Sequence, residues 1–208
     1  MARLLHISAS PRGAASESLA LAHHFTTSLR DARPDLEIET FDLWDGTLPA
    51  FGPEAVGAKM FVFAGQTPTG EQAVAWEAVR LTFERLAAVD QYLFSVPMWK
   101  HAIPYILKQF IDVVSQPGLL FRFDPAHGYT GLLTGKKAAV MYTSAVYGNG
   151  RPPSFGSDFQ APYFEQWLSW AGVSDITTVE FRPNLATADA DAERQRAHAA
   201  ARDAGKTF

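Results

Sequence analysis

The sequence predicts an α/β fold of the doubly wound class, in which a five-stranded parallel sheet carries helices on both faces. Three observations lead to this prediction. Short apolar runs without clean alternation recur along the chain, amphipathic helical patterns separate them, and polar loops rich in Gly, Pro or Ser end them. Because parallel strands need right-handed crossovers, we expect the strand order 2-1-3-4-5.

Length and composition favour one domain over residues 1–208. Of the 208 residues, 47% are hydrophobic and 19% charged, which suits a single large core. The formal net charge of −4 gives no electrostatic reason to expect a nucleic-acid or membrane partner. The chain has no Cys, which excludes disulfides, thiolate metal sites and cysteine nucleophiles. No signal peptide or long apolar run is recognisable, so we expect a cytoplasmic protein.

The first expected strand, residues 3–8, ends at a polar loop before a helix. Ser16 is placed to cap this helix, which continues until Pro34. Residues 36–43 then alternate between polar and apolar side chains, which predicts a half-buried strand near a sheet edge. In the helix after Ser16, the residues expected to face the core recur at helical spacing: Leu19, Ala22, Thr26 and Leu29.

Residues 44–70 carry many Gly and Pro residues without sustained periodicity, and they look like an insertion with one short helix over 54–63. Connections of this length are usually lids, binding loops or subunit contacts. Thr69 and Gln72 have the spacing of a capping box, which predicts the start of the next helix. The buried stripe of that helix is expected at Trp76, Val79, Phe83 and Leu86.

The second half of the chain continues the alternation of strands and helices. Residues 121–123 alternate before turn signals, which predicts a small hairpin outside the main sheet. The charged residues of the last helix look like a solvated face: Asp189, Asp191, Glu193, Arg194 and Arg196. Strands are expected at residues 91–96, 137–143 and 176–181, and helices at residues 103–114, 163–171 and 188–204.

In a sheet of this order the ligand crevice lies outside the carboxyl ends of the strands. Residues 9–18, 97–101 and 144–150 are the loops that meet there. The first loop carries several serines and Arg12 directly before a helix N-terminus, an arrangement that attracts anions. It lacks both G-x-G-x-x-G and G-x-x-x-x-G-K-[ST], so a monophosphate fits better than a pyrophosphate or triphosphate. The same serines also suit a helix cap and a turn.

The other two loops offer surface for a flat aromatic ligand. Met98 and Trp99 supply a polarizable and aromatic wall beside Lys100 and His101. Taken singly, Trp is more often a core residue, while Lys and His mostly face solvent. The loop after the fourth strand mixes small residues with Tyr147. A phosphate loop, an aromatic slot and small residues for close approach together predict flavin mononucleotide (FMN) as the ligand.

Other catalytic patterns are missing from the sequence. There is neither a G-x-S-x-G elbow nor an H-E-x-x-H zinc motif, and the histidines are scattered, which favours structural roles for them. Serines and Pro97 occupy the places where a phosphoacceptor receiver of similar topology needs acidic residues.

Several motifs spread over nearly the whole chain carry a resemblance to a known family: Ser10 with Ser16-Glu17-Ser18, Ser-Val-Pro-Met-Trp at 95–99, Leu-Lys-Gln-Phe-Ile-Asp at 107–112, Gly-Leu-Leu-Phe-Arg-Phe at 118–123 and Gly-Leu-Leu-Thr-Gly-Lys-Lys at 131–137. The chain resembles the FMN-dependent NADH:azoreductases and quinone reductases, which are flavodoxin-like proteins. The resemblance implies a homodimer with FMN at the subunit interface. It also implies NADH or NADPH as reductant, and ping-pong reduction of quinones or azo compounds.

The resemblance also implies roles for individual residues. Lys100, His101 and Tyr147 become candidate proton donors near the flavin. Aromatic surface for the substrate would come from Phe123, Trp167 and Trp170, in part from the partner subunit. The phosphate would be held by Ser10, Ser16, Glu17 and Ser18, and the flavin ring would be lined by Pro97, Met98, Trp99, Lys100, His101, Thr143, Ser144, Ala145 and Tyr147.

Two places depart from the family pattern. Many members have an Asn where this chain has Lys100, and we expect the lysine charge to stabilise the anionic reduced flavin and raise its reduction potential. Residues 143–146 lack the Arg and the Gly pair of the family loop. Two alternatives stay open, a flavodoxin-type electron carrier without small-molecule turnover and a flavin-free α/β binding module.

Overall fold

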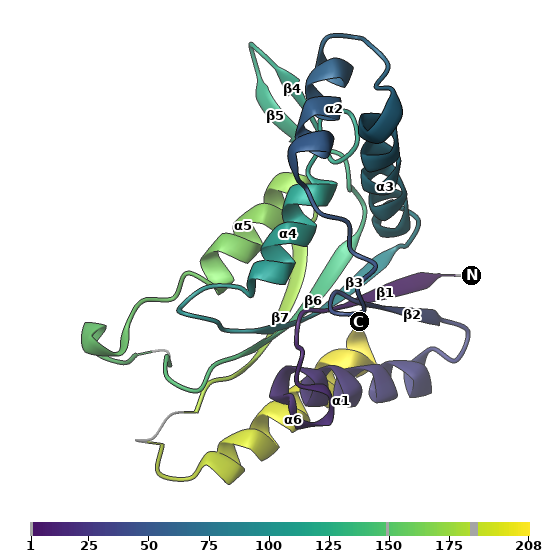
Figure 1. The fold of residues 1–208 in the computed structure, drawn as a ribbon. Coiled ribbons are helices and arrows are strands. Elements are labelled where there is room, and N and C mark those ends of the chain that lie inside the picture. Colours follow the sequence, from purple (N-terminus) through teal and green to yellow (C-terminus); the bar gives the residue numbers. More distant parts are fainter. Residues whose placement is uncertain (1, 149, 184–186) are drawn as a thin grey trace.

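The computed structural model describes residues 2–148, 150–183 and 187–208. Its centre is a parallel sheet in the order β2-β1-β3-β6-β7 (Figure 1). The predicted order counts only the strands of this sheet, of which β6 and β7 are the fourth and fifth. The strands are β1 (Arg3–Ser8), β2 (Glu37–Asp42), β3 (Gln91–Pro97), β6 (Lys137–Thr143) and β7 (Asp175–Phe181).

Helices cover both faces of the sheet. One face packs on α1 (Glu17–Ala32) and α6 (Ala190–Thr207), and the other on α3 (Gly70–Ala87), α4 (Tyr105–Val114) and α5 (Ala161–Ala171) (Figure 1). Strand β1 supplies Leu4 to the first core, and Leu5 and Ile7 to the second, because successive side chains point to opposite faces. Six of the seven residues of β3 are buried, which explains why its sequence does not alternate.

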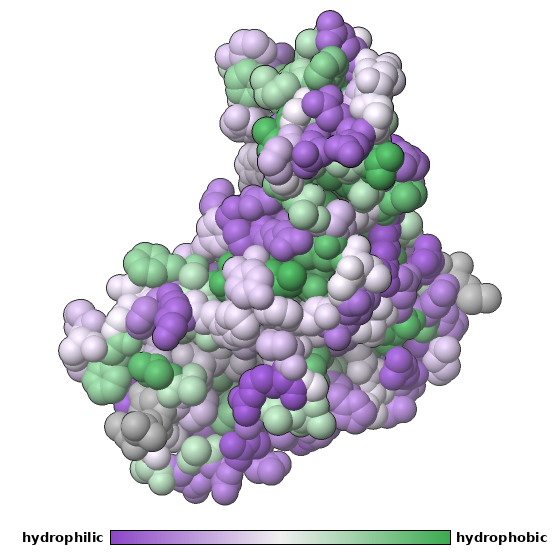
Figure 2. Space-filling model, viewed as in Figure 1, coloured by the Kyte–Doolittle hydropathy of each residue, from purple (hydrophilic) through white to green (hydrophobic). Residues whose placement is uncertain are grey.

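A smaller unit projects from one end of the sheet. The expected hairpin is present as β4 (Phe121–Asp124) and β5 (Gly128–Gly131), which pair antiparallel outside the main sheet. The helix expected within residues 44–70 is α2 (Pro53–Phe63), and it packs on α3. Figure 2 shows these elements rising above the broader body of the molecule. At Gly131 a Cβ would lie 2.2 Å from the backbone of Ala171, so the hairpin reaches α5 only because this residue is glycine.

Several predicted boundaries and contacts need correction. Thr69 precedes α3 but its side chain makes no capping hydrogen bond, so the capping box does not form. Helix α4 begins at Tyr105, two residues later than predicted, because the ring of Pro104 disfavours a helical conformation at Ile103. Leu19 is only partly buried, and Leu21 and Phe25 of α1 occupy the core instead. Single 3-10 turns span Gly13–Ala15 and Pro153–Phe155.

Candidate functional site

The three loops expected to form a site meet at the carboxyl ends of β1, β3 and β6. A cavity of about 300 Å³ lies there, and part of its wall comes from α6 and from the segment after β7. Register explains the convergence, since Ser8 pairs with Ser95 and Pro97 with Thr143, so neighbouring strands end at one edge. The lining residues are Ser10, Arg12, Ser16, Glu17, Pro97, Met98, Trp99, Thr143, Ser144, Ala145, Phe181, Pro183 and Arg194.

The loop after β1 presents hydroxyl and amide donors to this cavity. Ser16 is the N-cap of α1, and its Oγ accepts a hydrogen bond from the Leu19 amide at 3.3 Å. Ser18 is fully buried, with its Oγ 3.2 Å from that of Ser16. Ser10 is 3% exposed, and its Oγ has no hydrogen-bond partner among the described residues. A buried hydroxyl without a partner is costly, so the Ser10 side chain suits a polar ligand in the cavity.

The chain after β3 folds into a tight two-residue turn at the rim of the cavity. The Trp99 amide donates to the Ala102 carbonyl at 2.8 Å, and the Ala102 amide donates back to Trp99 at 3.0 Å. The two residues between them, Lys100 and His101, both have left-handed backbones, with φ of 48° and 69°. Turns of this kind require positive φ at both central residues, a conformation that ordinary side chains disfavour. The turn therefore holds Lys100 and His101 at fixed, strained positions.

Trp99 belongs to an aromatic cluster that the sequence did not reveal. Its ring centroid lies 5.7 Å from that of Trp44 and 5.8 Å from that of Tyr105, and the last two are 5.4 Å apart. Trp44 follows β2, and its Nε1 donates to the Ala9 carbonyl at 3.1 Å. This bond ties the aromatic cluster to the serine loop, so the polar and aromatic walls of the cavity form one connected unit.

The loop after β6 completes the cavity through its backbone and small side chains. Ser144 Oγ accepts from the amides of Val146 and Tyr147, at 3.3 and 3.0 Å, which closes a tight turn. The Met98 amide donates to the Thr143 carbonyl at 2.7 Å and joins this loop to the one after β3. A second cavity of about 260 Å³ shares lining residues with the first and is lined by Met98, Lys100, His101, Ser144, Ala145, Val146 and Tyr147.

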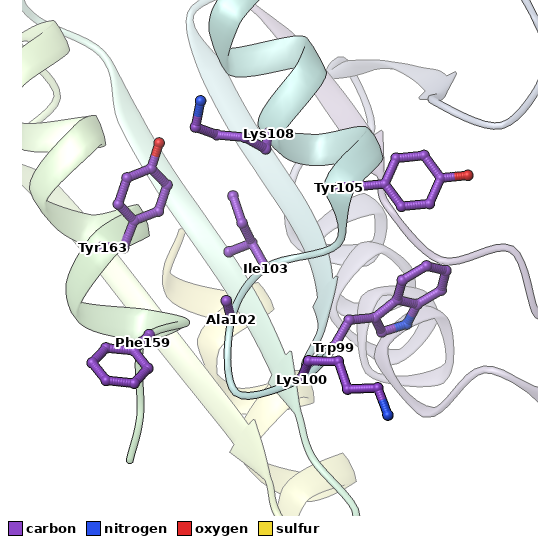
Figure 3. Close-up of a pocket in the computed structure, with 8 residues that line it drawn as sticks. All are labelled: Trp99, Lys100, Ala102, Ile103, Tyr105, Lys108, Phe159 and Tyr163. Carbon is purple, nitrogen blue, oxygen red and sulfur yellow. The ribbon is translucent and has the colours of Figure 1, made fainter. Parts of the chain in front are cut away.

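A third cavity, of about 610 Å³, lies on the other side of the turn (Figure 3). Trp99 lines both this cavity and the serine-bearing one, so the two cavities adjoin at this residue. Figure 3 shows where the other lining residues come from: the turn after β3 and the segment that follows it (Lys100, Ala102 and Ile103), α4 (Tyr105 and Lys108), and α5 with the segment before it (Tyr163 and Phe159). Large apolar side chains predominate, which suits an aromatic small molecule.

His6 lies in β1 behind the site, and its Nε2 is 2.8 Å from Ser95 Oγ. Burial lowers the pKa of this histidine to about 4, because the protein interior disfavours the charged imidazolium. His6 is therefore neutral near pH 7 and adds no charge to the cavity. In the described part of the chain, no group of three or more His, Asp or Glu side chains could hold a metal ion.

Comparison with known proteins places this geometry in a family. A model of proteins with the flavodoxin-like fold matches residues 2–204. This chain belongs to that family. It is 45% identical over 202 residues to an FMN-dependent NADH:quinone oxidoreductase of Ruegeria pomeroyi, covering 96% of this chain and 98% of the relative. It is 42% identical over 194 residues to a protein of the same name from Desulfotalea psychrophila, covering 93% and 91%.

Solved structures of the flavodoxin-like fold superpose closely on this chain. An azoreductase of Bacillus anthracis gives a TM-score of 0.91 at 24% identity, with complete coverage of both chains. An FMN-dependent NADH-azoreductase of the same species, in complex with FMN, gives 0.90 at 21% identity, covering 100% of this chain and 99% of the other. At these identities the likeness establishes the fold. None of the described helices is long and apolar enough to cross a lipid bilayer.

Most of the predicted ligand-binding residues of this flavodoxin-like chain come together, but the three predicted substrate residues do not. Trp167 was expected to offer aromatic surface, and this is wrong for the single chain. Its ring is 6% exposed, stacks on Phe164 in the core, and donates through Nε1 to Ser115 Oγ at 3.0 Å. Trp170 is partly buried against the hairpin, and Phe123 is exposed on β4; neither lines a cavity described above.

Arg194, at the cavity, and Trp44, packed against Trp99 beside it, are among the residues that the sequence did not assign to the site. Arg194 was assigned to the solvated face of the last helix, yet it lines the cavity and its Nε donates to Glu17 Oε1 at 3.0 Å. Trp44 was assigned to the start of an insertion. Neither position carries a local sequence signal, because each reaches the site only through the packing of distant elements.

Proposed function

We propose that this protein is an FMN-dependent NADH:quinone oxidoreductase that also reduces aromatic azo compounds. The observation that carries the proposal is the junction of an anion pocket with an aromatic wall at the carboxyl edge of the sheet, where three loops meet. The relatives named FMN-dependent NADH:quinone oxidoreductase, with up to 45% identity over nearly the whole chain, support the same activity.

The residues present fit FMN. The buried Ser10 hydroxyl lacks a partner among the described residues, and Ser16 and the first turn of α1 add donors suited to a phosphate. Glu17 needs one correction, because its carboxylate only accepts hydrogen bonds; a phosphate there would meet its backbone amide. We assign the phosphate to Ser10, Ser16, Glu17 and Ser18, and the flavin ring to Pro97, Met98, Trp99, Lys100, His101, Thr143, Ser144, Ala145 and Tyr147.

When bound, FMN supplies the two-electron chemistry, accepting hydride from NADH and passing the reducing equivalents to a quinone or azo compound. The chain itself binds, orients and excludes water. Trp99 lines two of the cavities, and the turn fixes Lys100 and His101 at the rim. Reduction of a quinone to a quinol also consumes protons, and Lys100, His101 and Tyr147, which share the second cavity, are the candidate donors.

We further propose one domain acting as a homodimer in the cytoplasm, where NADH is supplied. Phe123 and Tyr129 stand exposed on the hairpin, each with 59% of its surface accessible. In a dimer this hairpin is available to cover the site of the partner. Analytical ultracentrifugation tests whether the protein is a dimer in solution. If the hairpin contacts the substrate, Phe123→Ala is expected to raise KM for a quinone several-fold. An unchanged KM would contradict that role.

The deciding experiment is an anaerobic visible spectrum of the protein with FMN, recorded before NADH, after NADH and after menadione. We expect the flavin absorbance to bleach with NADH and to return with the quinone. A flavodoxin-type carrier would bind FMN but would not turn over NADH and menadione in a steady-state assay. Absence of flavin binding would refute the proposal and leave an α/β binding module.

A further inference from the structure

Arg194 lies near the N-terminal end of α6, far along the chain from the serine loop, yet it lines the serine-bearing cavity. Among the described lining residues, three carry charge near pH 7: Arg12, Glu17 and Arg194. Glu17 opens α1, directly after the capping Ser16. A free carboxylate at this position would repel the phosphate dianion for which the loop is suited.

The structure shows how this charge is neutralised. Arg194 Nε donates to Glu17 Oε1 at 3.0 Å, and Nη1 is paired with Asp191. The guanidinium carbon lies 5.3 Å from the centroid of the Phe181 ring, which is buried and also lines the cavity. The guanidinium is therefore held from three directions at the cavity wall.

The held guanidinium still has capacity for a ligand. Arginine carries five N–H donors, and the bonds to Glu17 and Asp191 use Nε and Nη1 but not Nη2. Planar guanidinium groups suit phosphate oxygens, and charge-assisted hydrogen bonds are stronger than neutral ones. The hydrogen bond with Glu17 also raises the pKa of Arg194, in keeping with a guanidinium that is cationic near pH 7.

We propose that Arg194 is a phosphate-recognition residue of the FMN site, and that Glu17 is the positioning residue that holds its guanidinium at the cavity. The inference rests on the proposed function, because it takes FMN as the ligand. The C-terminal helix thereby contributes to the choice of FMN over riboflavin, which has the same ring system without the phosphate.

The test compares dissociation constants for FMN and riboflavin, measured by quenching of flavin fluorescence. Arg194→Gln is expected to weaken FMN binding roughly tenfold, as loss of one partly exposed charge-assisted hydrogen bond implies, with riboflavin binding unchanged. Arg196→Gln is the matched control, since Arg196 is exposed two residues further along α6 and lines a different surface hollow. This variant should bind both flavins like the wild type.

A second substitution tests the role of Glu17. In the Arg194→Gln protein the carboxylate of Glu17 loses its partner and repels the phosphate, so adding Glu17→Gln should recover part of the lost FMN affinity. If the double variant binds FMN no better than Arg194→Gln alone, the neutralisation of the Glu17 charge by Arg194 is wrong. FMN binding should also depend less on salt in Arg194→Gln than in the wild type, because one attractive charge is gone.

Wild-type FMN binding and NADH–menadione turnover are measured first, and their absence would remove the proposed function together with this inference. If the wild type binds FMN and turns over, equal losses of FMN and riboflavin affinity in Arg194→Gln, or no loss of either, refute the inference alone. Unchanged riboflavin binding reports an intact fold. Should Arg194→Gln fail to fold, Arg194→Lys keeps the charge without the planar fork, and an FMN-selective loss smaller than tenfold is expected; no loss would overturn the proposal.

Discussion

The turn after β3 provides a test of strain at the site. Lys100 has a φ of 48°, in the left-handed region, where a Cβ crowds the backbone. That crowding costs roughly 1–2 kcal/mol for a residue other than glycine. Glycine escapes the cost but loses about 0.5–1 kcal/mol more conformational entropy on folding than alanine. The difference predicts that Lys100→Gly is more stable than Lys100→Ala by about 1 kcal/mol.

The alanine variant is the matched control, because both substitutions remove the lysine charge and the same side-chain atoms beyond Cβ. Urea unfolding is followed for both variants with FMN removed and at one protein concentration, since ligand and oligomer both shift apparent stability. Thermal unfolding offers a second readout, in which a difference of 1 kcal/mol corresponds to about 2–4 °C in Tm for a protein of this size. Equal stability of the two variants would show that the turn does not impose the strained backbone on Lys100.

Three further predictions concern the potential, the core and pH. Lys100→Ala should lower the flavin reduction potential by on the order of 10–20 mV, the equivalent of roughly 0.5–1 kcal/mol for an exposed charge, and spectroelectrochemistry that finds no change would refute it. Trp167→Phe should cost about 1–2 kcal/mol in urea unfolding, since it leaves Ser115 Oγ unpaired, yet kcat/KM for menadione should not change; a selective loss of activity would restore the substrate role. Because the pKa of His6 is lowered to about 4 in the folded protein, the unfolded chain binds a proton between pH 6.5 and 4 while the folded chain stays neutral at His6. The free energy of unfolding therefore falls as pH decreases from 6.5 to about 4, by up to about 3 kcal/mol. His6→Gln should remove that part of the pH dependence, and an identical slope in the variant would contradict the assignment to His6.

Much of the fold follows from local patterns. The run of apolar residues in β3 and the polar alternation in β2 reflect burial on two faces and on one, and both strands form where predicted. Ser16 caps α1 because a short hydroxyl side chain before a helix satisfies a free amide. Thr69 also precedes a helix, α3, but its hydroxyl makes no capping hydrogen bond. The sequence pattern shows that a cap is possible there, and the packing around the residue decides whether it forms.

The candidate site, like the fold, follows only in part from the sequence. The sequence alone determined the serine loop, the Met-Trp-Lys-His turn and the loop after β6, because the carboxyl ends of parallel strands must share one edge of the sheet. It could not determine that Trp167 lies in the core, since the same aromatic residue type suits a core and a ligand surface. Only the tertiary structure brought Arg194 to the cavity and Trp44 to the serine loop beside it, because contacts across 177 and 35 positions of the chain depend on how whole elements pack and leave no periodic trace in the sequence around them.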